Sequence, residues 1–276
     1  MKPFCISLLA LCVMLSATLS AQELCAVAYY DLDGLYDTVP SPFGGDGDYT
    51  PRGPKRWSGE RYRKAVERHA ALLDSLALPL IALFGVENEA VALDLAAHSQ
   101  GDYAVLHRTS SRRDGLDFAL LYQADYFLPG AVWSDYGLLL VEGELQGRKL
   151  RLLLCNDDDS LAECLERMAL RGELETLILL GAVGRAGEGH PLKDPLRKAE
   201  RAGRGTRLKG GAWQMRDRIL LGAAWEPVKA DVYAREWLLD SRTGAPLPLY
   251  SRDRYRGGRS RNLPLFLYFR PANLEN

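Results

Sequence analysis

The sequence contains a series of short apolar runs, separated by glycine, proline and charged residues. "LPLIALFGVE" (Leu78–Glu87) and "ELETLILLGAVGR" (Glu173–Arg185) are rich in aliphatic residues and stop at turn-forming ones. Runs of this kind are typical of buried strands. The other predicted strands are Leu24–Tyr30, Tyr103–His107, Leu116–Gln123, Gly137–Leu145, Arg148–Asn156, Met215–Gly222, Asp231–Leu239 and Leu263–Phe269.

Helical patterns lie between the early strands. Ser58 is a predicted N-cap, and the segment behind it carries apolar residues at helical spacing. Further helices are predicted over 89–97 and 161–171, and Gln146-Gly147 is typical of a hairpin turn. A chain of 276 residues with 47% hydrophobic content and a net charge of −1 is ordinary for a globular protein. We therefore predict one α/β domain over 22–276, with a mostly strand interior and helices outside.

The N-terminus resembles a secretory signal peptide. Lys2 precedes an apolar run, and small residues follow before a cleavage site predicted after Ala21. A membrane anchor is the alternative, but the run is short for a spanning helix. The expected signal peptide covers 1–21, and we expect a secreted or periplasmic protein that is free of the membrane after cleavage.

Removal of that segment leaves Cys25, Cys155 and Cys164. An odd number cannot all pair within one chain, so one disulfide and one buried thiol are expected in an oxidising compartment.

Six segments, in order along the chain, resemble the secreted bacterial branch of the endonuclease/exonuclease/phosphatase superfamily. They are "AYYDLDGLYDT", "DYTPRG…W…RYRKAVERHAALL", "LIALFGVENEAVALDL", "DGLDFALLY", "GTRLKGGAWQMRDRIL" and "GGRSRNLPLFLYF". The resemblance implies a four-layer α/β/β/α sandwich of two mostly antiparallel sheets with outer helices. It also implies an active site at one end of the sheets, where members hydrolyse phosphate esters with one or two divalent metals.

The sequence departs from the family pattern at the positions that bind metal and carry out catalysis in the family. The metal-binding Glu corresponds to Gly85, and Glu87 matches an outer Glu that does not hold the metal. Asp31 and Asp217 are retained. The family's middle histidine, its Gly-Asp-Phe-Asn pair and its final Asp-His correspond to Asn156, Ala182, Gly184, Arg261 and Asn262.

Glycine and alanine cannot coordinate Mg²⁺, which needs several hard oxygen ligands. The pattern therefore favours a non-catalytic binding or interaction module without a cofactor over an enzyme. The alternatives are an active Mg²⁺-dependent phosphodiesterase or nuclease with a rebuilt site and a structural protein without a ligand. A rebuilt metal site would draw on Asp157–Asp159 or His190, which we interpret instead as a solvated acidic run and a loop residue.

Two aspartates without a metal need a counter-charge. We expect Arg261, or Arg185, to supply it by forming ion pairs with Asp31 and Asp217.

The same end carries many basic residues, which are predicted to form an anion-binding cleft for phosphate, nucleic acid or an acidic polymer. A solvated basic loop face is the alternative, and the sequence identifies no protein partner. The predicted anion-binding residues are Arg185, Arg254, Arg256, Arg259 and Arg261.

Overall fold

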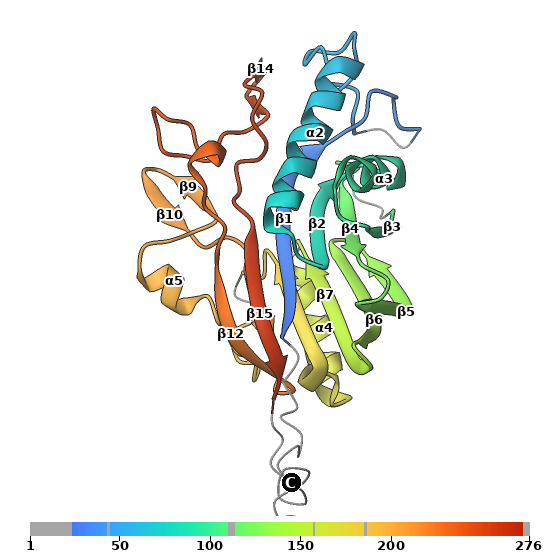
Figure 1. The fold of residues 1–276 in the computed structure, drawn as a ribbon, viewed down its shortest axis with the longest axis vertical. Helices are drawn as coiled ribbons and strands as arrows, with labels where there is room; N and C mark the ends of the chain where they lie inside the picture. Colours follow the sequence, from blue (N-terminus) through green and yellow to red (C-terminus); the bar gives the residue numbers. More distant parts are fainter. Residues whose placement is uncertain (1–23, 43–44, 110–113, 157, 185–186, 273–276) are drawn as a thin grey trace, which may run out of the picture.

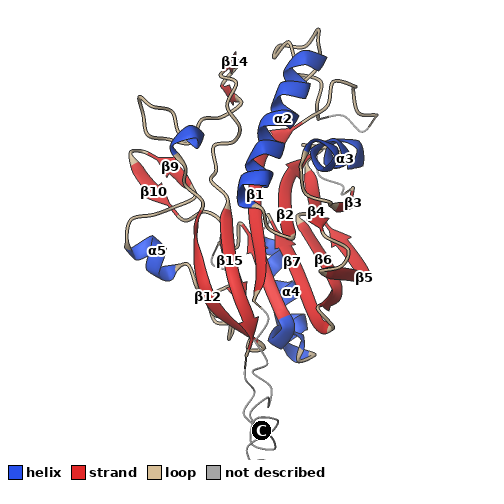
Figure 2. Cartoon of the chain, in the orientation of Figure 1, coloured by secondary structure: helices blue, strands red, loops and turns tan. Residues whose placement is uncertain are grey.

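The computed structural model describes residues 24–42, 45–109, 114–156, 158–184 and 187–272 (Figure 1). The predicted signal peptide lies outside these residues, so it stays a prediction. Two large sheets pack against each other and helices cover their outer faces, as the sandwich prediction requires (Figures 1 and 2).

The first large sheet has six strands, and only β1 and β2 run parallel to each other. Its order is β12 (Trp225–Val232), β15 (Leu265–Pro271), β1 (Cys25–Leu35), β2 (Leu80–Val86), β4 (Asp117–Tyr122) and β3 (Ala104–Arg108).

The second large sheet has five strands, and only β7 and β8 are parallel. Its order is β11 (Arg218–Leu221), β8 (Leu177–Gly181), β7 (Arg148–Cys155), β6 (Leu138–Leu145) and β5 (Phe127–Asp135). The turn between β6 and β7 is the predicted one, because Gln146 and Gly147 both adopt the positive φ that a two-residue hairpin requires.

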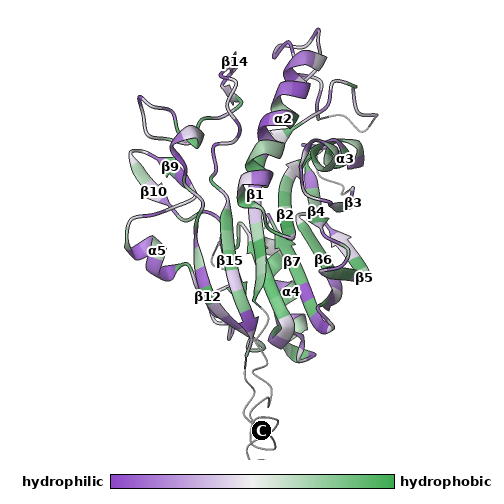
Figure 3. Cartoon of the chain, in the orientation of Figure 1, coloured by the Kyte–Doolittle hydropathy of each residue, from purple (hydrophilic) through white to green (hydrophobic). Residues whose placement is uncertain are grey.

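The main core lies between the two sheets. Successive side chains of a strand point to opposite faces, so Leu139 and Val141 of β6 face this core, whereas Leu138 faces the outer layer. Figure 3 shows the resulting hydrophobic colour along the central strands and hydrophilic colour over the outer elements.

Helices α2 (Gly59–Leu76) and α3 (Glu89–His98) lie over the first sheet, and α4 (Asp158–Leu170) lies over the second (Figure 1). The hydroxyl of Ser58 accepts a hydrogen bond from the backbone N–H of Arg61, which confirms the predicted N-cap. The single histidine of α2, His69, is fully buried against Tyr30.

Smaller elements complete the chain. They are the short helix α5 (Arg197–Arg201), the 3₁₀ turns η1 (Glu173–Thr176) and η2 (Glu236–Leu238), and the hairpins β9–β10 (Arg207–Lys209, Ala212–Gln214) and β13–β14 (Tyr250–Ser251, Arg254–Tyr255). None of the described helices combines the length and hydrophobicity that crossing a membrane needs.

Three sequence predictions were wrong in detail. The strand predicted at Asp231–Leu239 is instead β12, which ends at Val232 and is followed by η2. The first part of Glu173–Arg185 forms η1, so β8 is shorter than predicted. The expected disulfide is not formed. Cys25, Cys155 and Cys164 are all buried, and no two of them are bonded to each other.

Candidate functional site

The residues that the sequence singled out meet at one end of the two large sheets. Strands β7 and β8 are parallel, so Asn156 and Ala182, which follow them directly, lie at the same edge. β11 is antiparallel to β8, which places the start of β11, with Asp217 just before it, at that edge too. In the facing sheet, β15 is antiparallel to β1 and brings its preceding loop beside Asp31.

Arg216 is the centre of this site. Its Nη1 atom donates to Asp31 Oδ2 at 2.6 Å and to Asp217 Oδ1 at 2.9 Å. Its Nη2 atom donates to Asn156 Oδ1 at 3.1 Å. Asp31 belongs to the first sheet, whereas Asn156 and Asp217 border the second. One guanidinium therefore joins the two halves of the sandwich.

The backbone before β11 fixes the position of Arg216. Thr206 Oγ1 accepts hydrogen bonds from the backbone N–H groups of Arg216 at 3.2 Å and Asp217 at 3.3 Å. Thr206 is itself fully buried and accepts the backbone N–H of Leu263 through its carbonyl. These hydrogen bonds fix the backbone of Arg216 and Asp217, and so they limit the positions that the guanidinium can reach.

The two aspartates are almost without solvent contact, with side-chain exposures of 5% for Asp31 and 1% for Asp217. Burial raises the pKa of Asp217 to about 7 and also raises the pKa of Asp31, although the Arg216 charge opposes both shifts. Burial alone would lower the pKa of Arg216, but Asp217 and Asp31 raise it overall. One positive charge thus faces two carboxyls that titrate as a unit.

Several buried polar atoms around Arg216 have no hydrogen-bond partner in the part of the chain that the structure describes. They are Asp217 Oδ2, Asn262 Oδ1 and Tyr29 Oη. Buried polar groups are almost always satisfied by protein or ordered water. The site therefore keeps hydrogen-bonding capacity that solvent or a ligand can use.

Comparison with known proteins agrees with this architecture. The model of the Endonuclease/Exonuclease/phosphatase family matches residues 26–154. A solved endonuclease/exonuclease/phosphatase family protein from Bacteroides thetaiotaomicron is similar over 92% of this chain and 97% of its own, with 13% identity and a TM-score of 0.55. Residues 26–154 therefore match the endonuclease/exonuclease/phosphatase family, and the chain shares the fold of this solved family protein.

Other solved structures share the fold at similarly low identity. Truncated TDP2 from Caenorhabditis elegans has a TM-score of 0.59 and 13% identity, and the match covers 90% of this chain and 98% of that one. The mannosyl-6-phosphatase from Bacteroides thetaiotaomicron has a TM-score of 0.54 and 16% identity, with coverages of 89% and 99%. Among curated protein sequences, none matches this chain.

Gly85, the position that the sequence resemblance matches to a metal-binding Glu, has a backbone conformation that disfavours a side chain. It has φ +85°, and a Cβ atom built there would lie 3.1 Å from the backbone N of Gly34. The registers of β2 with β1 and β4 both shift beside it. A glutamate does not fit this conformation without strain.

Glu87 faces a different environment. Its Oε2 atom accepts the backbone N–H of Asp37 at 2.6 Å, and burial raises its pKa to about 7. Asp37 in turn accepts the Asn88 side chain at 3.0 Å. Glu87 therefore holds the loop after β1 and does not face the Arg216 cluster.

The Ser260-Arg261-Asn262 loop is tied to β1 by its serine. Ser260 Oγ donates to the carbonyl of Asp31 at 2.7 Å and accepts the backbone N–H of Asn262 at 2.9 Å. Arg261 Nη1 lies 3.2 Å from Asp33 Oδ1, and its side chain is half-exposed. Burial raises the pKa of Asp33 to about 6, against the opposing charge of Arg261.

The prediction that Arg261 or Arg185 neutralises Asp31 and Asp217 was wrong for Arg261, since Arg216 makes those ion pairs. Arg185 lies outside the described residues. One usable signal for Arg216 is present in the sequence, its position next to the retained Asp217, but other arginines are frequent around it. Which of them points inward depends on the fold.

The remaining predicted anion-binding arginines have different surroundings. Arg259 stacks on Trp237 and donates through Nε to the carbonyl of Arg68, so it is occupied inside the protein. Arg254 is exposed in β14, and Arg256 forms an ion pair with Asp240 at 3.2 Å.

The Arg216 cluster does not fit a divalent metal. Two of the carboxylate oxygens accept hydrogen bonds from the guanidinium, and Gly85 supplies no side-chain oxygen. Mg²⁺ demands a nearly octahedral set of oxygen ligands. Elsewhere in the described ranges, no group of three or more His, Cys, Asp or Glu side chains can hold a metal. The acidic run at 157–159 lies outside what can be described in side-chain detail, and His190 is a loop residue, as predicted.

Proposed function

We propose that this protein is a non-catalytic member of the superfamily that binds phosphate-bearing ligands, with single-stranded nucleic acid as the leading class. The observation that carries the proposal is the Arg216 guanidinium between Asp31 and Asp217. It supplies one positive charge inside the protein, where active members use a metal ion. A guanidinium cannot activate water or bind a phosphate oxygen as a Lewis acid does.

The replaced side chains support the same conclusion. Ala182 and Gly184 carry no group that can position water, and Gly85 carries no metal ligand. Loss of one member of a catalytic unit typically costs orders of magnitude in rate, and losses within a unit are not rescued by the members that remain. The retained Asp217 then acts as an ion-pair partner and not as a catalytic group.

A cavity of about 370 Å³ beside Arg261 supports the ligand class. Five cationic side chains line it, and Asp240 is its single acidic side chain. Arg256 is paired with Asp240 and Arg261 with Asp33. For the other three, no ion pair occurs within the described residues. The five cations are Arg207, Lys209, Arg242, Arg256 and Arg261.

Unpaired cations that converge on one cavity attract phosphate groups. The aspartates of the Arg216 cluster are close enough to Arg207 for its charge to influence their pKa values, so the cavity adjoins that cluster. Among the solved structures with this fold, TDP2 from D. rerio is complexed with a single-strand DNA product. That complex supports nucleic acid as the ligand to test first.

The first experiment tests catalysis. We expect the purified protein to leave single-stranded DNA and bis-p-nitrophenyl phosphate uncleaved with Mg²⁺, Mn²⁺ or Ca²⁺. The Asp217→Ala variant is assayed in parallel, because a contaminating nuclease would act in both samples. Turnover that Asp217→Ala abolishes would overturn the non-catalytic proposal and establish a rebuilt active site.

The second experiment tests binding by fluorescence anisotropy of a labelled single-stranded oligonucleotide over a range of salt concentrations. Each phosphate contact contributes about 0.7 to the slope of log K against log salt for single strands. We expect Arg207→Ala and Lys209→Ala each to weaken binding and reduce the slope. Arg63→Ala, an exposed charge change on α2, should leave binding intact. Absence of binding at low salt, or equal losses in all three variants, would exclude this cavity.

We also propose that the protein is exported, on the basis of the N-terminal sequence. Mass spectrometry of the protein expressed with its full N-terminus should give a chain that starts at Gln22. An intact N-terminus would contradict the proposal.

A further inference from the structure

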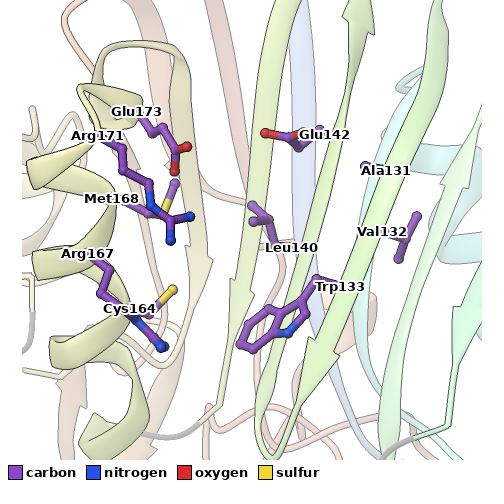
Figure 4. Close-up of a pocket in the computed structure, with 10 residues that line it drawn as sticks. All are labelled: Ala131, Val132, Trp133, Leu140, Glu142, Cys164, Arg167, Met168, Arg171 and Glu173. Atoms are coloured by element: carbon purple, nitrogen blue, oxygen red, sulfur yellow. The ribbon is translucent and has the colours of Figure 1, made fainter.

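A second cavity, of about 460 Å³, lies on the outer face of the second large sheet, between α4 and strands β5 and β6 (Figure 4). None of its lining residues belongs to the Arg216 cluster or to the basic cavity. Neighbouring strands are about 4.8 Å apart and a helix with its side chains is about 10 Å wide, so one helix covers about two strands. α4 packs on β7 and β8, through residues such as Leu153 and Leu179. The edge strand β5 therefore keeps an open outer face.

The floor of this groove is apolar. Trp133 of β5 is directly opposite Leu140 of β6, so both side chains point to the outer face. Trp133 is 41% exposed, an unusual state for an indole ring. Met168 and Cys164 of α4 close the floor from the other side, and both are buried. Burial raises the pKa of the Cys164 thiol, so it remains neutral and acts as part of the apolar surface.

The wall formed by α4 carries positive charge. Arg167 belongs to α4, and Arg171 directly follows the last residue of the helix; both side chains point toward the strands that carry Trp133 and Glu142 (Figure 4). Arg167 reaches Glu163 only at 3.8 Å, and both side chains are more than half exposed. Arg171 makes no ion pair within the described part of the chain.

The acidic residues at the end of the groove are already paired. Arg151 is nearly buried, and its Nε donates to Glu142 Oε1 at 2.8 Å. Its Nη2 lies 4.0 Å from Glu173, and its Nη1 donates to Thr176 at 2.9 Å. Arg151 thus balances one of these two carboxylates, and with Arg167 and Arg171 the groove carries three positive charges against the two negative charges of Glu142 and Glu173.

The edge of the sheet itself is poorly suited to binding another strand. Pro129 of β5 has no N–H to donate, and the pairing register breaks between Pro129 and Val132. Proline and bulges of this kind protect edge strands from pairing with other chains. The volume of the groove lies in the range of small-molecule sites, which combine an apolar lining with a few oriented polar groups.

We propose that this groove is a binding site for a small amphipathic anion, in which a flat apolar group lies on Trp133 and Leu140 and a carboxylate pairs with Arg171 and Arg167. The site goes beyond the proposed nucleic-acid function, because it lies on a different face and selects an apolar partner.

Isothermal titration calorimetry with three probes of one shape tests the charge requirement. The probes are 2-naphthoate, the neutral 2-naphthalenemethanol and the cationic 2-naphthylmethylamine. We expect one equivalent of 2-naphthoate to bind and the amine to bind at least about tenfold more weakly, because a hydrogen-bonded charge pair changes affinity by about that factor. The alcohol should lie between them.

Variants test the location. Arg171→Ala should weaken 2-naphthoate about tenfold, and Arg171→Glu should reverse the preference in favour of the amine. Trp133→Ala should weaken all three probes. Arg148→Ala removes an exposed positive charge at the far end of β7 and should leave the affinity unchanged. Circular dichroism and thermal unfolding confirm that each variant is folded.

The proposal fails if 2-naphthoate shows no binding at millimolar concentration. It also fails if the carboxylate and the amine bind equally, or if Arg148→Ala weakens the carboxylate as much as Arg171→Ala does.

Discussion

Substitution of Arg216 by alanine is the most direct test of the site. The change removes the guanidinium and leaves Asp31 and Asp217 facing each other in an environment where their side chains are 5% and 1% exposed. Breaking a buried ion pair by removing one partner typically costs about 3–5 kcal/mol. For a domain of this size, 1 kcal/mol corresponds to roughly 2–4 °C in Tm. We therefore expect Arg216→Ala to lower the Tm by roughly 6–20 °C at pH 8.

The loss should depend on pH. Without the opposing charge of Arg216, burial and the repulsion between the two carboxylates together raise both carboxyl pKa values further. The folded variant therefore holds protons that the unfolded chain releases above about pH 4. A folded pKa above the unfolded value gives stability that is present at low pH and lost as the pH rises. The difference from wild type should therefore be large at pH 8 and small near pH 4.

Differential scanning calorimetry at several pH values measures this difference. Arg270→Ala, which removes an exposed ion pair with Glu226, is the control and should cost less than about 1 kcal/mol. Adding Asp217→Asn to Arg216→Ala should recover part of the stability at pH 8. The reasoning is refuted if Arg216→Ala melts within about 1 °C of wild type at pH 8, or if its loss is the same at both ends of the pH range.

Three further substitutions address residues outside this ion pair. Gly85→Glu should lower stability by about 1–2 kcal/mol, because φ is +85° there, and should produce no metal-dependent hydrolysis; thermal unfolding and a phosphodiesterase assay measure both. His69 is buried with both ring nitrogens unpartnered among the described residues, and burial lowers its pKa from 6.5 to about 3. The unfolded chain therefore binds a proton that the folded protein does not, and folding stability falls as the pH drops below 6.5. His69→Leu should therefore gain about 2 kcal/mol relative to wild type on going from pH 8 to pH 5, as urea unfolding at the two pH values would reveal. Ser260→Ala leaves the Asp31 carbonyl and the Asn262 N–H without their buried partner and should cost about 2–4 kcal/mol in a urea titration.

Features set by local chemistry were predictable from the sequence. Ser58 begins α2 because a serine hydroxyl satisfies a free backbone N–H, and Gln146-Gly147 turns the chain because both residues adopt positive φ. The fully buried strands were also predictable, since a continuous apolar run has few other ways to be buried. Together with the order of the motifs, these signals were enough for the sandwich fold.

The edge strands β5 and β12 were not predictable in this way, although the edge strands β3 and β11 were predicted. β5 contains Pro129, and β12 contains Pro227 together with charged residues. Both strands border a sheet, where one side is solvated and proline is tolerated. The prediction favoured Asp231–Leu239 because its residues are more apolar. Val232 at the end of β12, Tyr233 after it and Leu238 in η2 are indeed buried, but the segment does not form one strand.

The sequence was enough to predict which family side chains are missing from the site, but not which residue pairs with the two aspartates. The sequence alone shows that Gly85 and Ala182 lack the carboxylates that the resemblance leads one to expect there. The identity of the arginine that reaches Asp31 is a long-range property, because 185 positions separate the two residues. The pairing of β11 with β8 places Arg216 at the edge of the second sheet, and the packing of the two sheets brings it to Asp31 on β1.

The bridge from Arg216 to Asp31 and Asp217 also changes how the sandwich depends on its surroundings. A metal ion that joins two sheets must be captured from solution, and a chelator or a poor supply of the ion removes it. A guanidinium is delivered by the chain itself and keeps its charge at every pH at which the protein folds. The ion pairs between the two sheets therefore form as soon as the sheets pack together, and they do not depend on the concentration of any ion in solution.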